Sequence, residues 1–551
     1  MLQGNHMGES IVPSHRLKLS VLLCVGLATA ACSAVDQAPA SRQVHVDLGA
    51  TGIDVASGRL LVFVENAKEA EASAKDGKVT EVDGDLLAPD KVTVIGTEVD
   101  RLAAGHGVDI HADAMSFPRP LAQLPPGDYY VQAVLDPDHS YNYTGRGTGD
   151  IVSGVVKMHW PSATAPTLKL TSVLPSSDPW WQPGTTPPGA GDALVDARKH
   201  VEPVDFISPA LTAFWGRPTH MRGLVLLPPG YDPKGSTTYP VAYITHGFGG
   251  GLEHFAKAVA STWTAMSSGE MPPMIWVYLD ESSPTGTHEF ADSVNNGPWG
   301  KALTEELIPQ LESTYRMDAR VSGRFLNGHS SGGWATLWLQ TRYPKVFGGT
   351  WSTSPDPSDF HDFTGIDLYA PHANVYRKAD GSPYPLVRDK GKVLATFQQF
   401  AQVERVQGSY GGQLASFEWV FSPRGQDGSP LPMFNRDTGD VDPKVVAYWR
   451  ENFDIAHRLQ EHWTELGPDL DGKIHLIVGT ADTFYLDGAA HRLKDVLDGL
   501  HAKADIRFLP DKTHFDLYVV GKDRSALLKQ ISWEMYAVAR PQSTLKHAAA
   551  P

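Results

Sequence analysis

The feature that most constrains the fold is a series of short apolar segments that alternate with helical stretches from about residue 200 onward. Short apolar runs joined by helices are typical of parallel strands that are buried on both faces. The sequence therefore predicts an α/β fold with a doubly wound, mostly parallel sheet and helices on both of its faces. We expect strands at 222–227, 241–245, 274–279, 324–327, 348–352, 474–478 and 505–509, and helices at 253–266, 301–315, 332–342, 488–501 and 523–539.

The alternation breaks between Pro355 and Leu470, in a segment rich in aromatic residues such as Phe397, Phe417 and Trp449. We interpret residues 355–470 as an insertion whose aromatic residues form a small core of their own. The alternative is that some of them form a lid over a site, because loops at the carboxyl ends of parallel strands carry the specificity of such sheets.

The N-terminal third has a different pattern, with β-type segments over residues 43–173 and almost no helical periodicity. In residues 124–136 (LPPGDYYVQAVLD), a Pro-Gly turn leads into an alternating run, which is a strand signal. Short strands at this spacing predict an antiparallel sandwich. We assign residues 40–173 to an N-terminal all-β accessory domain, with binding of a carbohydrate or a surface as the alternative role. A Pro/Gly-rich linker over 174–200 then precedes the α/β domain at 201–545.

The first 32 residues have the pattern of an export signal. A basic stretch at 15–18 precedes an apolar run at 21–31, which is too short to span a bilayer. Small residues directly before Cys32 predict lipoprotein-type processing with lipidation of Cys32; ordinary cleavage nearby is the alternative. We therefore expect an exported protein, in the periplasm or as an outer-membrane lipoprotein, with secretion as the alternative. The other cysteine is Cys24, so no internal disulfide is expected.

A net charge of −16 argues against a nucleic-acid partner, because binding to phosphates requires a basic face.

The segment NGHSSGGW (327–334) contains the pattern G-x-S-x-G with Ser330 at its centre. It lies between an apolar strand candidate and a helix candidate, and a serine on such a strand-turn-helix elbow is held above the sheet. Ser330 is therefore the candidate nucleophile, and a simple turn is the alternative.

A serine hydroxyl needs a base and an acid that orients the base. In elbow folds of this kind, the acid and then the histidine follow the serine along the chain. Asp482 follows a late strand candidate and a Gly-Thr-Ala turn, and His514 follows the last one. Asp487 is the rival acid, although its place at a helix start suits the helix dipole. No pair of histidines has metal-ligand spacing and H-E-x-x-H is absent, so no metal is predicted.

The glycine-rich loop at 245–251 (THGFGGG) follows another strand candidate and can direct amide groups at a developing negative charge. We expect the amides of Phe248 and Ser331 to form an oxyanion hole. The rival interpretation, a phosphate cradle, lacks the ending of a P-loop and the acid of a dinucleotide site, so no cofactor is predicted. The residues expected to support the two loops are His246, Gly247, Gly249, Gly328, His329 and Gly332.

With these motifs in order, residues 218–540 resemble the α/β-hydrolase family of esterases that includes esterase D (S-formylglutathione hydrolase), enterochelin esterases, feruloyl esterases and mycolyltransferases. The resemblance implies that Asp482, in a G-x-D-x-F stretch, is the acid, and that His514, before an aromatic residue, is the base. The insertion and the N-terminal segment depart from the compact esterase D form. The stretches that carry the resemblance are 239–251, 297–318, 323–349, 479–488 and 513–518.

The resemblance implies a serine carboxylic-ester hydrolase that forms an acyl-enzyme on a small-molecule or glycan ester. Three enzymatic alternatives stay open: an acyltransferase with a sugar or lipid acceptor, a feruloyl or acetyl esterase of carbohydrates, and a serine peptidase. The non-enzymatic alternative is a surface-binding lipoprotein on an inactive hydrolase scaffold. A lipid anchor at Cys32 is the expected contact with a membrane.

Overall fold

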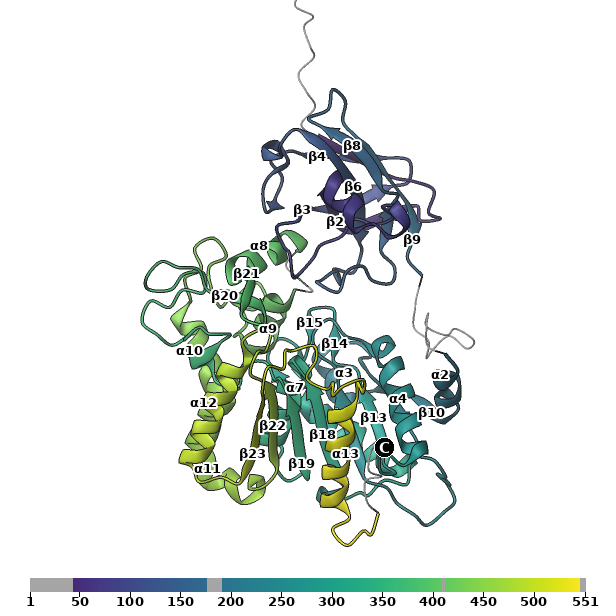
Figure 1. Cartoon of the computed structure of the whole chain (residues 1–551), viewed down its shortest axis with the longest axis vertical. Helices are drawn as coiled ribbons and strands as arrows, with labels where there is room; N and C mark the ends of the chain where they lie inside the picture. The colour runs from purple at the N-terminus through teal and green to yellow at the C-terminus, as the bar shows by residue number, and fades with distance from the viewer. Residues whose placement is uncertain (1–42, 176–190, 409, 411, 546–551) are drawn as a thin grey trace, which may run out of the picture. The chain divides into compact units, whose positions relative to one another are not determined.

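A computed structural model describes residues 43–175 and 191–545, except 409 and 411 (Figure 1). The predicted export signal over 1–32, with Cys32, lies outside these residues, as does the middle of the predicted linker. Among the described helices, none has the length and apolar character needed to cross a membrane. The described residues from 43 onward form one compact unit, and the domain boundaries predicted inside it stay predictions.

The C-terminal part is built on an eight-stranded sheet in the order β10-β11-β13-β12-β18-β19-β22-β23. The pairs from β13 to β23 are parallel, whereas β10–β11 and β11–β13 are antiparallel. The predicted mostly parallel sheet is confirmed. The strands are β10 (Val201–Ile207), β11 (His220–Leu226), β12 (Val241–Thr245), β13 (Ile275–Leu279), β18 (Arg324–His329), β19 (Gly349–Thr353), β22 (Ile474–Gly479) and β23 (Ala504–Leu509).

The sequence prediction missed β10, which forms an edge of this sheet. Its residues are all at least partly exposed, and it contains Pro203. An edge strand can tolerate a proline and needs no continuous apolar run, so the signal used for the buried strands is absent there.

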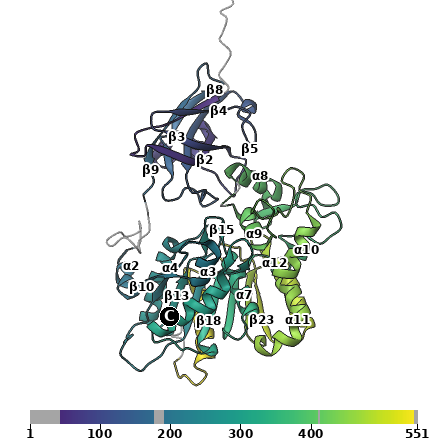
Figure 2. The ribbon, with the colours of Figure 1, turned by 180° about the vertical axis from the view of Figure 1, so that it is seen from behind.

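Helices cover both faces of this sheet (Figures 1 and 2). Alternate side chains of β13 show the two faces: Trp276 and Tyr278 pack in one core with α4 and α13, whereas Ile275 and Val277 pack in another with α6 and α7. The predicted helices are confirmed. The α-helices of this part outside the insertion, together with the π-helix η5, are α2 (Gly191–Ala197), α3 (Pro209–Trp215), α4 (Phe255–Ser268), α5 (Trp299–Lys301), η5 (Ala302–Leu307), α6 (Ile308–Thr314), α7 (Ser331–Arg342), α12 (Leu486–Gly499) and α13 (Ala526–Ala539).

Over its described residues, the insertion between β19 and β22 contains a short hairpin, four α-helices and the short 3-10 helix η7 (Phe360–Asp362). Many of its aromatic side chains, including Phe360, Phe421 and Trp449, share one core with Trp334 and Trp338 of α7. The aromatic residues therefore do form a core, but one that is continuous with the sheet's own helix rather than separate. The elements are β20 (Pro385–Asp389), β21 (Lys392–Thr396), α8 (Phe397–Gln407), α9 (Gln413–Phe421), α10 (Pro443–Phe453) and α11 (Ile455–Leu470).

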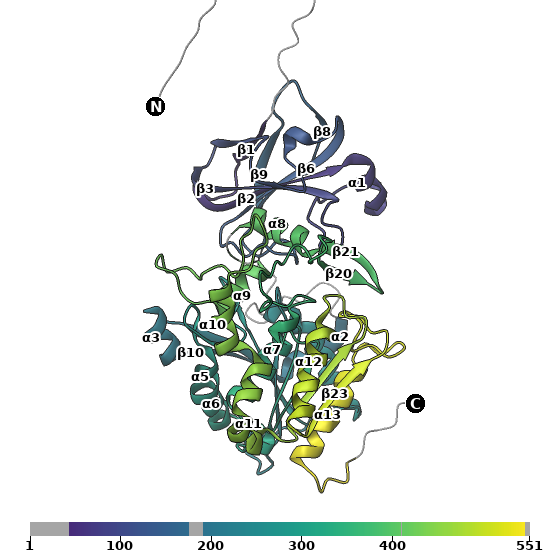
Figure 3. The same cartoon turned by 90° about the vertical axis from the view of Figure 1, so that its left-hand side faces the viewer.

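The N-terminal part consists mainly of strands (Figure 3). They form a single nine-stranded sheet in which β1 and β9 pair in parallel and the other pairs are antiparallel. The sequence predicted an antiparallel sandwich, whereas all nine strands join one hydrogen-bonded network. The strand β6 helps to connect this network, because its first half pairs with β8 and its second half pairs with β7. The strands are β1 (Gln43–Leu48), β2 (Val55–Asn66), β3 (Val92–Ala103), β4 (Gly107–His111), β5 (Ser116–Phe117), β6 (Gly127–Asp136), β7 (Ile151–Ser153), β8 (Val156–Trp160) and β9 (Thr167–Val173).

Candidate active site

Ser330 stands at the turn between β18 and α7 with a backbone φ of 61° and ψ of −126°. A non-glycine residue rarely adopts a positive φ, and such strain is concentrated at functional sites. The turn requires its flanking glycines, because a Cβ on Gly328 would lie 2.1 Å from the carbonyl oxygen of Gly332. The structure therefore has the strained elbow that the G-x-S-x-G pattern predicts.

His514 and Asp482 meet in the loops that follow β23 and β22. Nδ1 of His514 lies 3.0 Å from Oδ2 of Asp482, and both side chains are buried. Burial by itself would raise the pKa of Asp482, but the hydrogen bonds from His514 and from the Phe484 amide hold it below its ordinary value. Asp482 is therefore an anion that can orient the imidazole. The rival acid, Asp487, instead bonds Arg388 at 2.7 Å.

The glycine-rich loop after β12 lies against the elbow. A Cβ on Gly247 would come within 3.1 Å of the Ser330 Cβ, so the two loops are in close contact. The carbonyl oxygen of Phe248 accepts a hydrogen bond from the Tyr143 hydroxyl at 2.7 Å. Over residues 43–175 and 191–545, the amides of Phe248 and Ser331 donate to no protein acceptor. Both amides are thus free to bind a ligand oxygen.

His246 anchors the start of that loop. Its Nδ1 lies 2.8 Å from the Gly247 carbonyl oxygen and its Nε2 lies 3.1 Å from Oδ1 of Asp280. Burial lowers the pKa of His246, but the Asp280 hydrogen bond and the charges of Glu281 and Asp280 outweigh burial and raise it to about 9. The Glu281 amide also lies 3.0 Å from Nε2 of His246, so this side chain ties the glycine-rich loop to the residues that follow β13.

His329 supports the catalytic histidine candidate through its backbone. Its Nε2 donates to the carbonyl oxygen of His514 at 3.0 Å. Burial, followed by the neighbouring His514, lowers the pKa of His329 to about 3, so this ring is neutral. A neutral ring beside His514 leaves one histidine of the pair to take up a proton.

Ser330 and His514 line the same pocket, whose volume is about 430 Å³. The insertion supplies much of its apolar wall. The N-terminal part supplies Tyr143 and Thr144, from the loop between β6 and β7. A concave, mostly apolar pocket with a few polar groups is the usual form of a small-molecule site. The aromatic residues contributed by the insertion are Phe363, Phe397, Phe400 and Phe417.

Two residues of this site are absent from the sequence predictions. Asp356 accepts the Ser331 hydroxyl hydrogen bond at 2.5 Å, and its amide donates to the Ser330 carbonyl oxygen at 3.2 Å. Burial raises the pKa of Asp356 to about 6. Asp356 and Tyr143 belong to no motif, and no local signal in the sequence could have pointed to them.

A sequence model of the family described as "Putative esterase" matches residues 217–499, just over half of the chain. The chain belongs to this family. The predicted resemblance is thereby confirmed, and the matched region includes the glycine-rich loop, the elbow and Asp482. His514 follows its end.

Among curated proteins, the chain is similar to Esterase MT1326 and Esterase Rv1288, both from Mycobacterium tuberculosis strains. Each is 30% identical over 141 residues, which are 25% of this chain and 30% of the relative's length. The chain thus spans under a third of the relatives it matches.

Two similar solved structures are a ferulic acid esterase and an S-formylglutathione hydrolase from Agrobacterium tumefaciens. The first is 15% identical and covers 61% of this chain and 98% of its own, with a TM-score of 0.36. The second is 13% identical and covers 61% of this chain and 95% of its own, with a TM-score of 0.35.

Proposed function

We propose that this protein is a serine carboxylic-ester hydrolase that acts through an acyl-enzyme. The observation that carries the proposal is that Ser330, at its strained elbow, lines one pocket with His514, whose Nδ1 is bonded to Asp482. A nucleophile, a base and an orienting acid together are what acyl transfer requires.

In the first half-reaction the Ser330 Oγ attacks the ester carbonyl carbon while Nε2 of His514 takes the hydroxyl proton. The carbonyl oxygen becomes an oxyanion, and the amides of Phe248 and Ser331 donate to it. The tetrahedral intermediate then collapses, the bond to the alcohol oxygen breaks, and His514 returns its proton to the leaving alcohol. Ser330 is left as an ester of the acyl group.

In the second half-reaction His514 takes a proton from water, and the resulting hydroxide oxygen attacks the acyl carbon. Collapse of the second intermediate releases the acid and restores the Ser330 hydroxyl with the proton that His514 held. Asp482 keeps Nδ1 of His514 protonated and stabilises the imidazolium in both halves.

The pocket indicates the class of ester. Its walls are mainly aromatic and aliphatic, with Phe363, Phe397 and Phe417 from the insertion. We infer an ester with an apolar or aromatic acyl group of modest size, attached to a small alcohol or to a glycan. The insertion would act as the lid, and the N-terminal sheet as an accessory domain that closes the pocket with Tyr143.

The test is an ester panel on the purified protein, with p-nitrophenyl esters of increasing acyl length and methyl ferulate. Ser330→Ala should lower kcat by roughly 10³-fold or more, because removal of the nucleophile leaves only binding and the oxyanion hole. The matched control is Ser313→Ala, an exposed serine on α6, which should keep wild-type turnover.

Labelling with a fluorophosphonate separates the remaining outcomes. Labelling of Ser330 with turnover only after an alcohol is added would make the protein an acyltransferase. A Ser330→Ala variant that hydrolyses esters at the wild-type rate would contradict the mechanism. Neither turnover nor labelling in the wild type would favour an inactive scaffold.

A further inference from the structure

The loop between β6 and β7 carries three aspartates whose carboxylates gather at its two ends. Asp136 ends β6, Asp138 follows it, and Asp150 directly precedes β7. One carboxylate oxygen from each lies within 4.8 Å of the other two. Asp136 and Asp150 are buried, with 1% and 0% of their surface exposed, while Asp138 is exposed. Carboxylates this close repel one another unless a positive charge or a proton lies among them.

The protein satisfies only part of this cluster. Asp136 accepts from the amides of Ser140 and Tyr141, and Asp138 accepts from the Ser140 amide. Oδ2 of Asp150 accepts from the Gly147 amide at 2.8 Å. Its Oδ1 is buried and accepts no hydrogen bond from the described residues. A buried carboxylate oxygen rarely lacks a partner, and such an atom points to a missing ligand.

The cation that acts on Asp150 is Arg146, but other groups occupy this guanidinium. It lies 3.3 Å from Glu81 and 3.4 Å from Asp83. It also donates to the Val82 carbonyl oxygen and to the side-chain oxygen of Gln132. The negative charge of the three carboxylates is therefore not balanced by Arg146, which also pairs with Glu81 and Asp83.

We propose that Asp136, Asp138 and Asp150 bind one Ca²⁺ ion. Calcium takes oxygen ligands at about 2.3–2.6 Å, so two oxygens bound to one ion stand at most about 5 Å apart. The three carboxylate oxygens, all within 4.8 Å of one another, meet this condition. Backbone carbonyls of the loop and water would complete the six to eight ligands that calcium takes. The all-carboxylate donor set disfavours zinc and copper, which prefer nitrogen and sulfur. The site revises the sequence prediction of no metal, which rested on histidine spacing.

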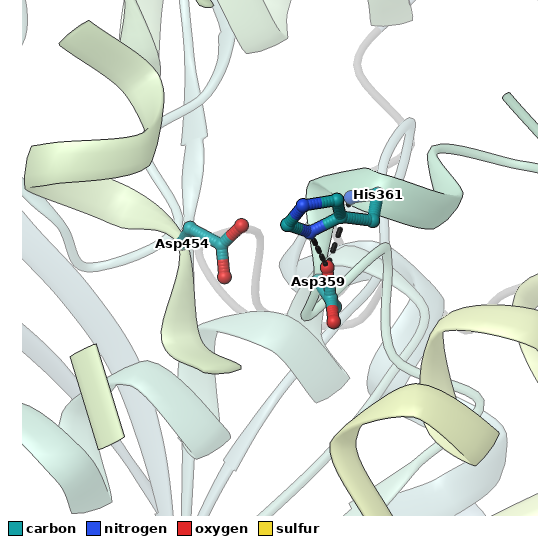
Figure 4. A group of neighbouring side chains, drawn as sticks. All are labelled: Asp359, His361 and Asp454. Atoms are coloured by element: carbon teal, nitrogen blue, oxygen red, sulfur yellow. Dashed lines mark hydrogen bonds and ion pairs between the residues drawn. The ribbon is translucent and has the colours of Figure 1, made fainter. Parts of the chain in front are cut away.

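A second group of side chains is also spaced closely enough to bind a metal ion, but its carboxylate oxygens all accept hydrogen bonds from the protein. It consists of Asp359, His361 and Asp454 (Figure 4). Asp359 bonds His361 Nδ1 at 2.9 Å through one oxygen and Arg492 at 3.2 Å through the other. Asp454 accepts from the Phe360 amide, the His457 amide and the Tyr369 hydroxyl. Every carboxylate oxygen there has a protein donor, and a cation is present, so we assign no metal to it.

The proposed site also bears on the active site, a consequence that rests on the proposed function. The loop that the ion would close carries Tyr143, which bonds the Phe248 carbonyl oxygen. It also carries Thr144, whose Cγ2 would lie 2.7 Å from a Cβ on Gly249. Calcium bound at both ends of the loop would hold these residues on the oxyanion loop.

The test is calorimetric titration of the EDTA-treated full chain with Ca²⁺ and, separately, with Mg²⁺. We expect one Ca²⁺ per chain, bound more tightly than Mg²⁺, and a higher unfolding temperature with Ca²⁺. Asp150→Asn and Asp138→Asn should each weaken binding by roughly tenfold or more, since affinity follows the number of charged ligands. The matched control is Asp128→Asn, an exposed carboxylate of β6, which should bind Ca²⁺ as the wild type does.

No Ca²⁺ binding by the wild type would overturn the site, and so would unchanged affinity in Asp138→Asn. Because Asp138 is exposed, its variant decides the matter even where Asp150→Asn fails to fold. Equal affinity for Mg²⁺ would overturn the assignment to calcium. Ester turnover that is the same with EDTA and with Ca²⁺ would overturn only the link to the active site. A wild type that binds Ca²⁺ but hydrolyses no ester would contradict the proposed function and leave the site supported.

Discussion

The two loops that form the candidate active site are held in place by different means. The elbow after β18 is formed within its own turn, with the Trp334 amide bonded to the Ser330 carbonyl oxygen and Gly328 packed on Gly332. The end of β19 and the residues after it add two more bonds, from the Ser330 amide to the Thr353 carbonyl oxygen at 3.1 Å and from the Asp356 amide to the Ser330 carbonyl oxygen at 3.2 Å. The glycine-rich loop after β12 is held by distant residues, with Tyr143 bonded to Phe248 and Asp280 bonded to His246. The turn that carries the proposed nucleophile is therefore encoded by residues close together in the chain, whereas the loop of the proposed oxyanion hole is held mainly by residues far away in the chain.

The largest effect is expected from a substitution of Asp482, the residue that orients His514. Asp482→Asn should lower kcat by about 10³- to 10⁴-fold, because the amide cannot hold Nδ1 of His514 in its protonated form. The measurement is the steady-state rate on the best ester of the panel, with circular dichroism as a check of folding. Asp487→Asn is the matched control, since Asp487 bonds Arg388, and it should retain most of the activity. Equal losses in the two variants would contradict the choice of Asp482.

A second prediction targets the point where the two loops touch. A Cβ on Gly332 would lie 2.4 Å from the His246 carbonyl oxygen, so Gly332→Ala must push the loops apart. We expect kcat to fall by about 10²-fold, as a displacement of roughly 1 Å can cause. The control is Gly499→Ala, near the end of α12, where a Cβ meets no atom within 4 Å. Wild-type turnover in Gly332→Ala would show that the contact between the loops is not needed.

The third prediction concerns the pH dependence of stability that His246, in the glycine-rich loop after β12, should cause. The folded-state pKa of His246 is raised to about 9, above the ordinary value of 6.5. A raised pKa contributes stability that is complete below about pH 6.5 and lost as the pH rises through about 9. The free energy of unfolding should therefore fall by about 1–3 kcal/mol between about pH 7 and pH 9.5.

Urea unfolding at a series of pH values measures this loss. Burial raises the pKa of Glu281 to about 7, so the slope above about pH 8 belongs mainly to His246. His246→Gln should flatten that slope, whereas His254→Gln, a substitution at an exposed histidine, should leave it as in the wild type. A flat wild-type profile over this range would mean that His246 is not charged in the folded protein.

The smallest effect is expected from Tyr143→Phe, which removes one hydroxyl from the N-terminal part. Loss of the hydrogen bond to the Phe248 carbonyl oxygen should cost about 1 kcal/mol and lower kcat by roughly three- to tenfold with little change in KM. The matched control is Tyr130→Phe, whose hydroxyl bonds Glu71 away from the pocket. The same kcat in both variants would show that the N-terminal part does not position the oxyanion loop.

Much of the fold could be predicted because the buried strands and amphipathic helices carry their signals within short windows. The β10 edge strand was missed because it is partly exposed and contains Pro203. The spacing of the N-terminal strands predicted a sandwich, whereas the strands form one hydrogen-bonded sheet. The pairing of β6 with both β7 and β8 contributes to this, and the spacing of strands along the chain does not show which strands pair.

The sequence by itself determined the elbow, the order of the acid and the histidine, and the glycine-rich loop, since each is encoded by residues close together along the chain. The sequence also favoured Asp482 over Asp487, and the structure agrees, since Asp482 meets His514 while Asp487 bonds Arg388. Only the tertiary structure decided that Asp356 bonds Ser331 and that Tyr143 reaches the pocket. These contacts join residues far apart in the chain. Their geometry follows from how the sheets and the insertion pack, and no local pattern of residues encodes it.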